Sequence, residues 1–325
     1  MRIGNWISKA AALAAGLLCA SALAQQWPVK PVRIIVPFPP GQGADIVARL
    51  LAEKLTPAIG QQVVIDNRPG AGGALGTELL TKATPDGYTL ATGGSGPLTI
   101  SPSVYAKLGY DPVKDIAPII NLVWLPMVFC VHPASPIQGV QDLIRLAKQS
   151  PGEVTYGSSG IGSTAHLTVE LFASIAGVKL THITYKGSIP AFTDLVGGRI
   201  TTLAESTPSV LPNVSAGRVR AIGVSTLKRT PLLPDVPTLD EQGIKGYEVM
   251  AWASLIAPAG TPVAILDRLH AEVARIIAQP DIQARFRDLA AMTAGGSREQ
   301  FGAYIKSEIA KWAKVVAASG TRVEH

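Results

Sequence analysis

The hydrophobic and polar positions of this chain follow two alternating patterns. Short runs rich in β-branched residues, typical of buried strands, are followed by glycine-bearing stretches and then by segments whose apolar residues recur every three or four positions, typical of helices. Runs of the first kind predict strands at residues 32–36, 62–66, 88–92, 154–156, 182–185, 200–205, 220–224 and 248–257. Segments of the second kind predict helices from about 45 onward, at 74–82, 140–149, 167–175 and 190–196, near 210, at 266–277, through 286–289 and at 301–316. This alternation predicts an α/β fold with mainly parallel sheets.

One long stretch interrupts the alternation. Residues 116–131 are almost continuously apolar and are broken by Pro126, which predicts strands that carry the chain into a second domain. Residues 227–246 are rich in Pro and Leu and suit a segment that crosses between lobes. We therefore expect one lobe made of 25–125 plus 248–325 and a second lobe made of 126–247.

The first strand, its loop and its helix, within residues 32–51, form the stretch around which the chain is organised. Between Pro37 and Asp45 the loop contains no Lys, His, Cys or Ser, so it offers backbone amides and apolar walls but no nucleophile. Unpaired N–H groups at a helix start attract an anion. The alternative is an ordinary turn between a strand and a helix.

Similar glycine loops recur downstream, at 67–73, 93–96 and 157–163. The first does not match GxGxxG, because Leu75 occupies the third glycine position, so a dinucleotide site has little support. Ser95 in the second loop is either a ligand donor or a turn serine. The third loop adds hydroxyls to its glycines and opens a helix, which predicts a second anion-binding loop.

The first residues resemble a targeting signal. Arg2 and Lys9 precede an apolar run, and the small residues 22–24 suit cleavage, so we interpret residues 1–24 as a signal peptide for export to the periplasm. Cys19 lies within this signal, and lipid attachment there is the weaker interpretation. Cleavage leaves Cys130 alone, and therefore without an internal disulfide.

Composition narrows the class of ligand. The chain of 325 residues is 47% hydrophobic and 16% charged, a globular mixture able to bury a core. Removing Arg2 and Lys9 lowers its formal charge from +6 to +4. No basic run with interleaved aromatic residues predicts nucleic-acid binding, whereas a small positive excess suits anionic small molecules.

An enzyme has little support in the sequence. Ser225 and Lys228 match SxxK, but neither SDN nor KTG occurs, and GxSxG is absent. The histidines are scattered without HExxH, and no metal or other cofactor is expected. A serine hydrolase that uses Ser225 remains the remote alternative.

Six segments together resemble one family. They are PFPPGQGADIVAR at 37–49, VVIDNRPGAGGALGTE at 63–78, PDGYTL at 85–90, YGSSGIGSTAHLTVELF at 156–172, YKGSIPAFTDLVGGRI at 185–200 and PDVPTLDEQG at 234–243. With them the chain resembles the periplasmic solute-binding proteins of tripartite tricarboxylate transporters, the Bug family. The resemblance implies a two-lobed, type II-like periplasmic binding protein fold that traps one ligand in the cleft between its lobes.

The resemblance also implies which residues hold the ligand. Family members bind a carboxylate through backbone amides and ordered waters at the loop before the first helix, which faces a serine and glycine loop of the other lobe. The expected ligand-binding residues are Phe38, Pro40, Gly41, Gln42, Gly43, Gly72, Gly73, Ser95, Ser158, Ser159, Gly160, Ile161, Gly162, Ser163, Lys186 and Glu205. Gln42 stands where the family usually has glycine, and Ala74 where it often has Asn, so ligand geometry need not transfer directly.

Two charged residues carry separate hypotheses. Glu205 either faces the cleft and pairs with a ligand's amino group or protonated acid, or is a solvated or helix-capping glutamate. Lys186 either neutralises a carboxylate or is solvated. Phe38, Leu75 and Ile161 favour an acid with a hydrocarbon or aromatic body, unless they pack within a lobe.

The expected function is capture of a small organic acid by an exported, monomeric binding protein that presents it to membrane permease subunits. The alternative from another class is an orphan ligand scavenger or a periplasmic sensor partner.

Overall fold

The computed structural model describes residues 27–323, so the expected signal peptide at 1–24 lies outside the described residues. The strands are β1 (Val32–Val36), β2 (Val63–Asn67), β3 (Thr89–Gly93), β4 (Ile116–Val131), β5 (Thr155–Ser158), β6 (Thr181–Thr184), β7 (Thr202–Ser206), β8 (Arg220–Val224), β9 (Met250–Pro258) and β10 (Met292–Gly295). The helices are α2 (Gly43–Ile59), α3 (Ala74–Thr81), α4 (Ser101–Val104), α5 (Val140–Gln149), α6 (Thr164–Ala176), α7 (Ser188–Val196), α8 (Thr207–Ser215), α9 (Val263–Ile277), α10 (Pro280–Asp288) and α11 (Arg298–Ser319), with short turns η1 (Ala71–Gly73) and η2 (Gly96–Ile100).

The strands form one continuous sheet in the order β2-β1-β3-β9-β4-β7-β5-β6, with β8 and β10 also paired to β4. The outer strands pair in parallel, as β1 does with β2 and β3, and β5 with β6 and β7. The central pairs that involve β4 and β9 are antiparallel. The prediction of mainly parallel sheets is therefore right at the two ends and wrong in the middle.

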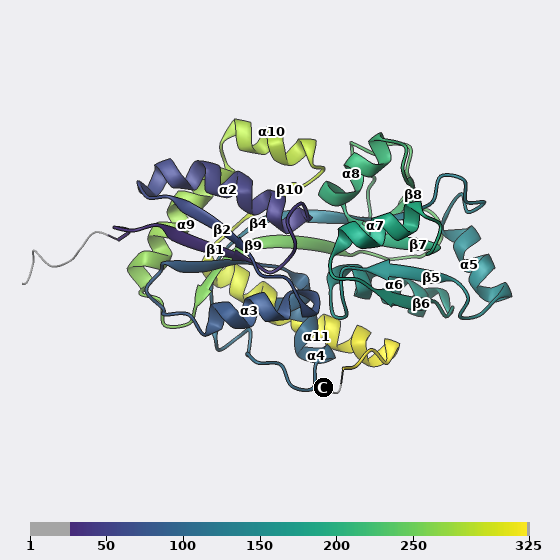
Figure 1. The fold of residues 1–325 in the computed structure, drawn as a ribbon, viewed down its shortest axis with the longest axis horizontal. Helices are drawn as coiled ribbons and strands as arrows, with labels where there is room; N and C mark the ends of the chain where they lie inside the picture. Colours follow the sequence, from purple (N-terminus) through teal and green to yellow (C-terminus); the bar gives the residue numbers. More distant parts are fainter. Residues whose placement is uncertain (1–26, 324–325) are drawn as a thin grey trace, which may run out of the picture.

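Strand β4 joins the two halves of the molecule. Up to Pro126 it pairs with β9, and from Met127 onward it pairs with β7 and β8. Figure 1 shows β4 and β9 running lengthwise from the half with α2 and α9 to the half with α5 to α8. Proline cannot donate to a ladder, so Pro126 suits the point at which the strand changes partners.

The segment 227–246 does not cross between lobes, so that prediction is wrong. Leu239 and Ile244 are buried in the same cluster as Phe129 of β4, and Thr238 forms a bridge with Val224. The segment therefore folds back onto its own half. Strands β4 and β9 make the connection instead.

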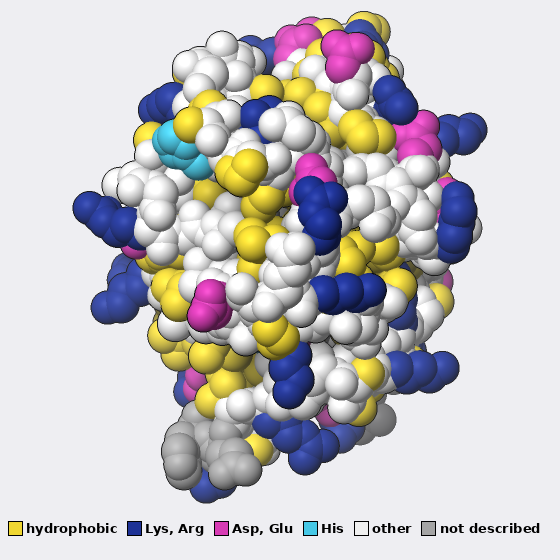
Figure 2. All heavy atoms as spheres, turned by 90° about the vertical axis from the view of Figure 1, so that its right-hand side faces the viewer, with side chains coloured by type: hydrophobic (Ala, Val, Ile, Leu, Met, Phe, Trp, Pro, Cys, Tyr) yellow, Lys and Arg dark blue, Asp and Glu magenta, His cyan; other side chains and the backbone are white. Residues whose placement is uncertain are grey.

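Basic side chains are scattered over one end of the molecule. On the face shown in Figure 2, which is the right-hand end of Figure 1, Lys and Arg side chains are spread between acidic, apolar and polar ones. The basic excess on this face is thus not gathered into a stripe. Within residues 27–323, no helix combines the length and hydrophobicity that crossing a bilayer requires.

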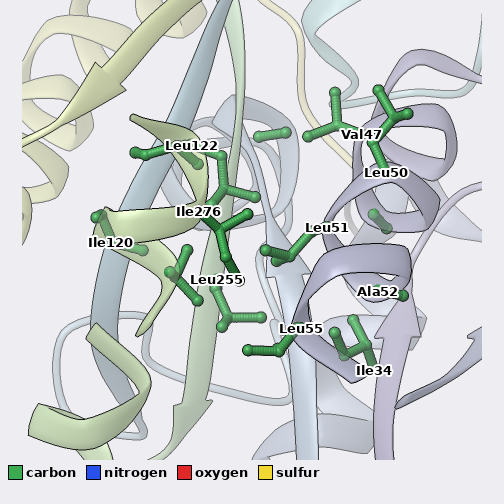
Figure 3. Packing of buried hydrophobic residues seen from close by; sticks show 14 of the residues in the cluster. Ile34, Val47, Leu50, Leu51, Ala52, Leu55, Ile120, Leu122, Leu255 and Ile276 are labelled. Atoms are coloured by element: carbon green, nitrogen blue, oxygen red, sulfur yellow. The ribbon is translucent and has the colours of Figure 1, made fainter. Parts of the chain in front are cut away.

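The core is divided between the two halves. In the first, Leu51 and Leu55 of α2 and Ile276 of α9 pack over Ile34 and Leu255 of the sheet (Figure 3). Their spacing of three or four residues puts the apolar positions of each helix on one face. This packing fixes the start of α2 at the end of β1.

The second half has its own cluster, which includes Phe129, Tyr156 and Phe172. Helix α11 reaches both halves. Its Phe301 packs beside Trp252, whereas its Trp312 belongs to the cluster of Phe129. The C-terminal helix therefore braces the two halves of the sheet.

Candidate functional site

A cavity lies where the two halves meet, at the ends of β1, β3, β5 and β7. Its volume is about 40 Å³, room for a few water molecules. Its lining comprises Phe38, Gln42, Gly43, Ala44, Gly94, Ser95, Leu125, Ser159, Ser163, Thr164, Ala165, Glu205, Ser206, Ala251 and Trp252. The two glycine loops singled out in the sequence thus face one shared cavity.

Helix α2 begins at this cavity with unused backbone donors. The amides of Asp45 and Ile46 donate to the carbonyl of Gln42 at 2.8 and 3.1 Å. Within residues 27–323, the amides of Gly43 and Ala44 have no protein acceptor. They lie at the positive end of a helix of 17 residues, where an anion is stabilised.

Helix α6 begins on the opposite wall with the same arrangement. Ser163 is its N-cap, and the Ser163 hydroxyl accepts from the amide of His166 at 3.2 Å. In the described part of the chain, the amides of Thr164 and Ala165 have no acceptor. Two helix starts, one from each half, therefore present free N–H groups to the same cavity.

The side chain of Asp45 stabilises the loop between β1 and α2. Its carboxylate accepts from the amide of Gly41 at 2.9 Å, from Arg49 at 2.9 Å and from Asn67 at 2.8 Å. Burial acts to raise the pKa of Asp45, but the hydrogen bonds from Arg49, Gly41 and Asn67 outweigh it, so the pKa is lowered. The amide of Gly41 is therefore occupied by Asp45.

Within residues 27–323, three residues of the lining carry buried side-chain polar atoms without a hydrogen-bond partner. These atoms are Oε1 of Gln42, Oγ of Ser95 and Nε1 of Trp252. Unpartnered buried polar groups are costly and rare, which marks them as candidates for contact with a ligand or with water. Gln42 and Ser95 were expected from the sequence, whereas Trp252 was not.

Glu205 lies in the cavity wall at the end of β7 and is only 6% exposed. Its Oε2 accepts from the hydroxyl of Ser188, and its Oε1 accepts from the amide of Ser206 at 2.8 Å. Burial raises the pKa of this carboxyl, and the hydrogen bonds from Ser188 and Ser206 oppose the rise. Glu205 thus lines the cavity and also accepts from the N-cap residue of α8, and its contact with a ligand stays a prediction.

The glycine and serine loop at 157–163, called the serine loop below, has two kinds of residue. Some line the cavity, and others make hydrogen bonds that hold the loop in place. Ser159 and Ser163 line the cavity. Ser158 instead bonds His182 Nε2 through its hydroxyl at 2.7 Å, and the amide of Gly162 donates to His166 Nδ1 at 3.3 Å. Gly160 and Ile161 also lie outside the lining, and the Ile161 carbonyl accepts from the hydroxyl of Tyr105 at 2.9 Å.

The remaining expected residues lie outside the cavity. Gly72 packs against the backbone of the serine loop, and Gly73 packs beside Phe38. Pro40, Gly41 and Lys186 are exposed and do not line the cavity. In this structure Lys186 therefore does not place a cation beside the helix starts.

Ser225 does not resemble a nucleophile. It is fully buried, and its hydroxyl accepts from the amide of Met127 at 2.8 Å and donates to the carbonyl of Val249. Both partners belong to segments that connect the two halves of the molecule. The hydroxyl is therefore held in a structural role.

Comparisons with known proteins agree with this architecture. The family model described as "Tripartite tricarboxylate transporter family receptor" matches residues 47–321. Protein BugT of Bordetella pertussis is 34% identical over 308 residues, which are 94% of this chain and 94% of BugT.

Solved structures of similar proteins have the same fold. The structure described as "R. palustris Rpa4515 with adipate" is 38% identical with a TM-score of 0.88, covering 91% of this chain and 99% of that chain. MatC from Rhodopseudomonas palustris with bound malate is 31% identical with a TM-score of 0.85, covering 89% of this chain and 100% of that chain. The predicted two-lobed periplasmic binding protein fold is confirmed, and the chain belongs to the tripartite tricarboxylate transporter receptor family, as the resemblance to Bug proteins indicated.

Proposed function

We propose that this protein is a periplasmic solute-binding protein that captures a small organic acid between its lobes and presents it to the permease subunits of a transporter. The observation that carries the proposal is the pair of helix starts, at Gly43–Ala44 and Thr164–Ala165, with free amides on one cavity. Membership of the receptor family supports it, as do two similar structures, one with adipate and one with malate.

The chemistry of the cavity suits a carboxylate held by neutral donors. Among the described residues, no Lys or Arg lines the cavity. Hydrogen bonds from amides to a charged acceptor contribute about 1.5–3 kcal/mol each. Affinity would then come from the number of amides and from exclusion of water.

Entry of the ligand requires the lobes to part. The walls of the cavity come from both lobes, with Gly43 and Ala44 on one side and Thr164 and Ala165 on the other, so a ligand held between them enters when the lobes part. We infer that the lobes rotate about β4 and β9, where β4 changes partners at Pro126. The ligand would stabilise the closed form, and a permease could then distinguish closed from open.

The test is a thermal-shift screen of the mature chain. Aliphatic dicarboxylates, aromatic carboxylates, amino acids and nicotinate are each compared with the amide of the same skeleton, in which an uncharged group replaces the carboxylate. A ligand at 100 times its Kd should stabilise the protein by about 2.7 kcal/mol. The proposal predicts that an acid stabilises the protein and its amide does not; stabilisation by neutral sugars alone would contradict it.

A further inference from the structure

The proposed function explains the donors of the cavity but leaves one buried acid unexplained. Glu205 is surrounded by residues of the cavity wall, and in the described part of the chain it takes part in no ion pair. An ionised carboxylate of this kind is costly to bury without a cation. A buried acid in a cleft, without a charged partner among the described residues, is a candidate functional group.

The hydrogen bonds of Glu205 leave room for that partner. A carboxylate has about four acceptor positions. Ser188 and Ser206 each fill one of them. The remaining positions need donors, and the unpartnered Oε1 of Gln42 is a further buried acceptor on the same cavity.

The position of Glu205 defines where a ligand donor would lie. A Cβ placed on Gly43 would be 2.7 Å from the hydroxyl of Ser206, the residue that follows Glu205. Ser206 therefore lies against the start of α2, and Glu205 lines the same cavity as the amide donors of Gly43 and Ala44. A ligand that reaches both would carry its own donor within a few bonds of its carboxylate.

We propose that Glu205 determines specificity by binding an ammonium group next to the ligand's carboxylate, so that the protein selects amino acids over unsubstituted acids of the same skeleton. This inference rests on the proposed function, since the carboxylate of the same ligand occupies the two helix starts. A hydroxyl at the same carbon would donate one hydrogen bond without charge. It should therefore bind with intermediate affinity.

Isothermal titration with matched ligands tests the proposal. The series are succinate, malate and aspartate; glutarate, 2-hydroxyglutarate and glutamate; and propionate, lactate and alanine. Within the skeleton that binds tightest, the amino acid should have a Kd at least tenfold lower than the unsubstituted acid, with the hydroxy acid between them.

In the variant Glu205→Gln, the side-chain oxygen still accepts from the amide of Ser206, and the side-chain amide donates to the hydroxyl of Ser188. The substitution removes only the negative charge. It should reduce the preference for the amino acid to less than about threefold, while the unsubstituted acid binds as well as before or better. Glu53→Gln makes the same change on the exposed face of α2 and should keep the wild-type ranking.

The outcomes separate the two proposals. Acids that bind without preference for the amino group, or a preference that survives in Glu205→Gln, would overturn the role of Glu205 and leave the proposed function standing. Binding by no acid of the three series would overturn the role of Glu205, and binding by none of the acids in the thermal-shift screen would overturn both.

Discussion

The backbone of Gly72 lies directly against the backbone of Ile161, across the boundary between the two halves. A Cβ on Gly72 would be only 2.5 Å from the carbonyl oxygen of Ile161 and 2.9 Å from the amide nitrogen of Ser163. Both neighbours are main-chain atoms, so neither can move aside as a side chain can. This contact joins the glycine loop at 67–73 to the serine loop at 157–163.

Gly72→Ala should therefore prevent full closure. We expect at least a tenfold loss of acid affinity in isothermal titration, because the new methyl group collides with the backbone at 161–163 only when the lobes close. Gly72 has φ +61°, so alanine also introduces about 1–2 kcal/mol of backbone strain.

Gly60→Ala is the matched control for that strain. Gly60 has φ +74°, and nothing lies within 4 Å of a Cβ placed there. It should lose similar stability in urea unfolding while its affinity is unchanged. Equal affinities of the two variants would contradict a role for Gly72 in closure.

Gln42→Met should raise the stability of the ligand-free protein and weaken ligand binding. Gln42 is 8% exposed, and its Oε1 has no partner, so an apolar side chain of similar shape removes a desolvation cost of about 1–3 kcal/mol. Urea unfolding and isothermal titration measure the two effects. Gln62→Met, at an exposed position beside β2, is the control, and a Gln42→Met variant with unchanged affinity would remove Gln42 from the site.

Acidic pH should destabilise the protein through His166 and His182, the stacked histidines that contact the serine loop. Burial lowers the pKa of His166 to about 3, with a further contribution from His182, and burial lowers the pKa of His182 to about 4. The rings stack at 4.0 Å between centroids. In the unfolded chain both titrate near pH 6.5, so the unfolded state binds protons first as the pH falls.

Stability should therefore decrease from about pH 6.5 toward pH 4, by at most about 1.4 kcal/mol per pH unit for each histidine. Urea unfolding between pH 4.5 and 7.5 measures this slope. The variants His166→Gln and His182→Gln should each have a shallower slope than the wild type. A wild-type slope that persists in both would contradict the assignment.

Ser225→Ala should act on stability and not on any reaction. The loss of the hydroxyl leaves the buried amide of Met127 without its acceptor, at a cost of about 1–3 kcal/mol in the free energy of unfolding. Urea unfolding measures that cost. An ester turnover that the wild type shows and Ser225→Ala lacks would instead support the hydrolase alternative.

The sequence predicted local structure well where the pattern is strong. The β-branched run at 32–36 and the apolar stripe from Leu266 to Ile277 became β1 and α9, because periodicity fixes which face is buried. Strand β10 was missed: it has four residues and no clear alternation, and it exists through its pairing with β4.

The site was only partly predictable, because some of its contacts depend on how distant segments of the chain pack together. The composition of the glycine loops predicts that a helix starts after each of them, so the sequence identified Gly43 and Ser163 as candidate ligand-binding residues. Trp252 lies on β9, far along the chain, and reaches the cavity only because β9 is placed between β3 and β4. The sequence pattern places Gly72 in a loop, but its contact with Ile161 depends on how the two halves of the molecule meet.

The most direct test of the whole account is a crystal structure with the acid that gives the largest thermal shift. We predict that its carboxylate oxygens accept hydrogen bonds from the amides of Gly43 or Ala44 on one side and Thr164 or Ala165 on the other. A carboxylate bound elsewhere through lysine or arginine, with both helix starts unoccupied by ligand, would contradict it.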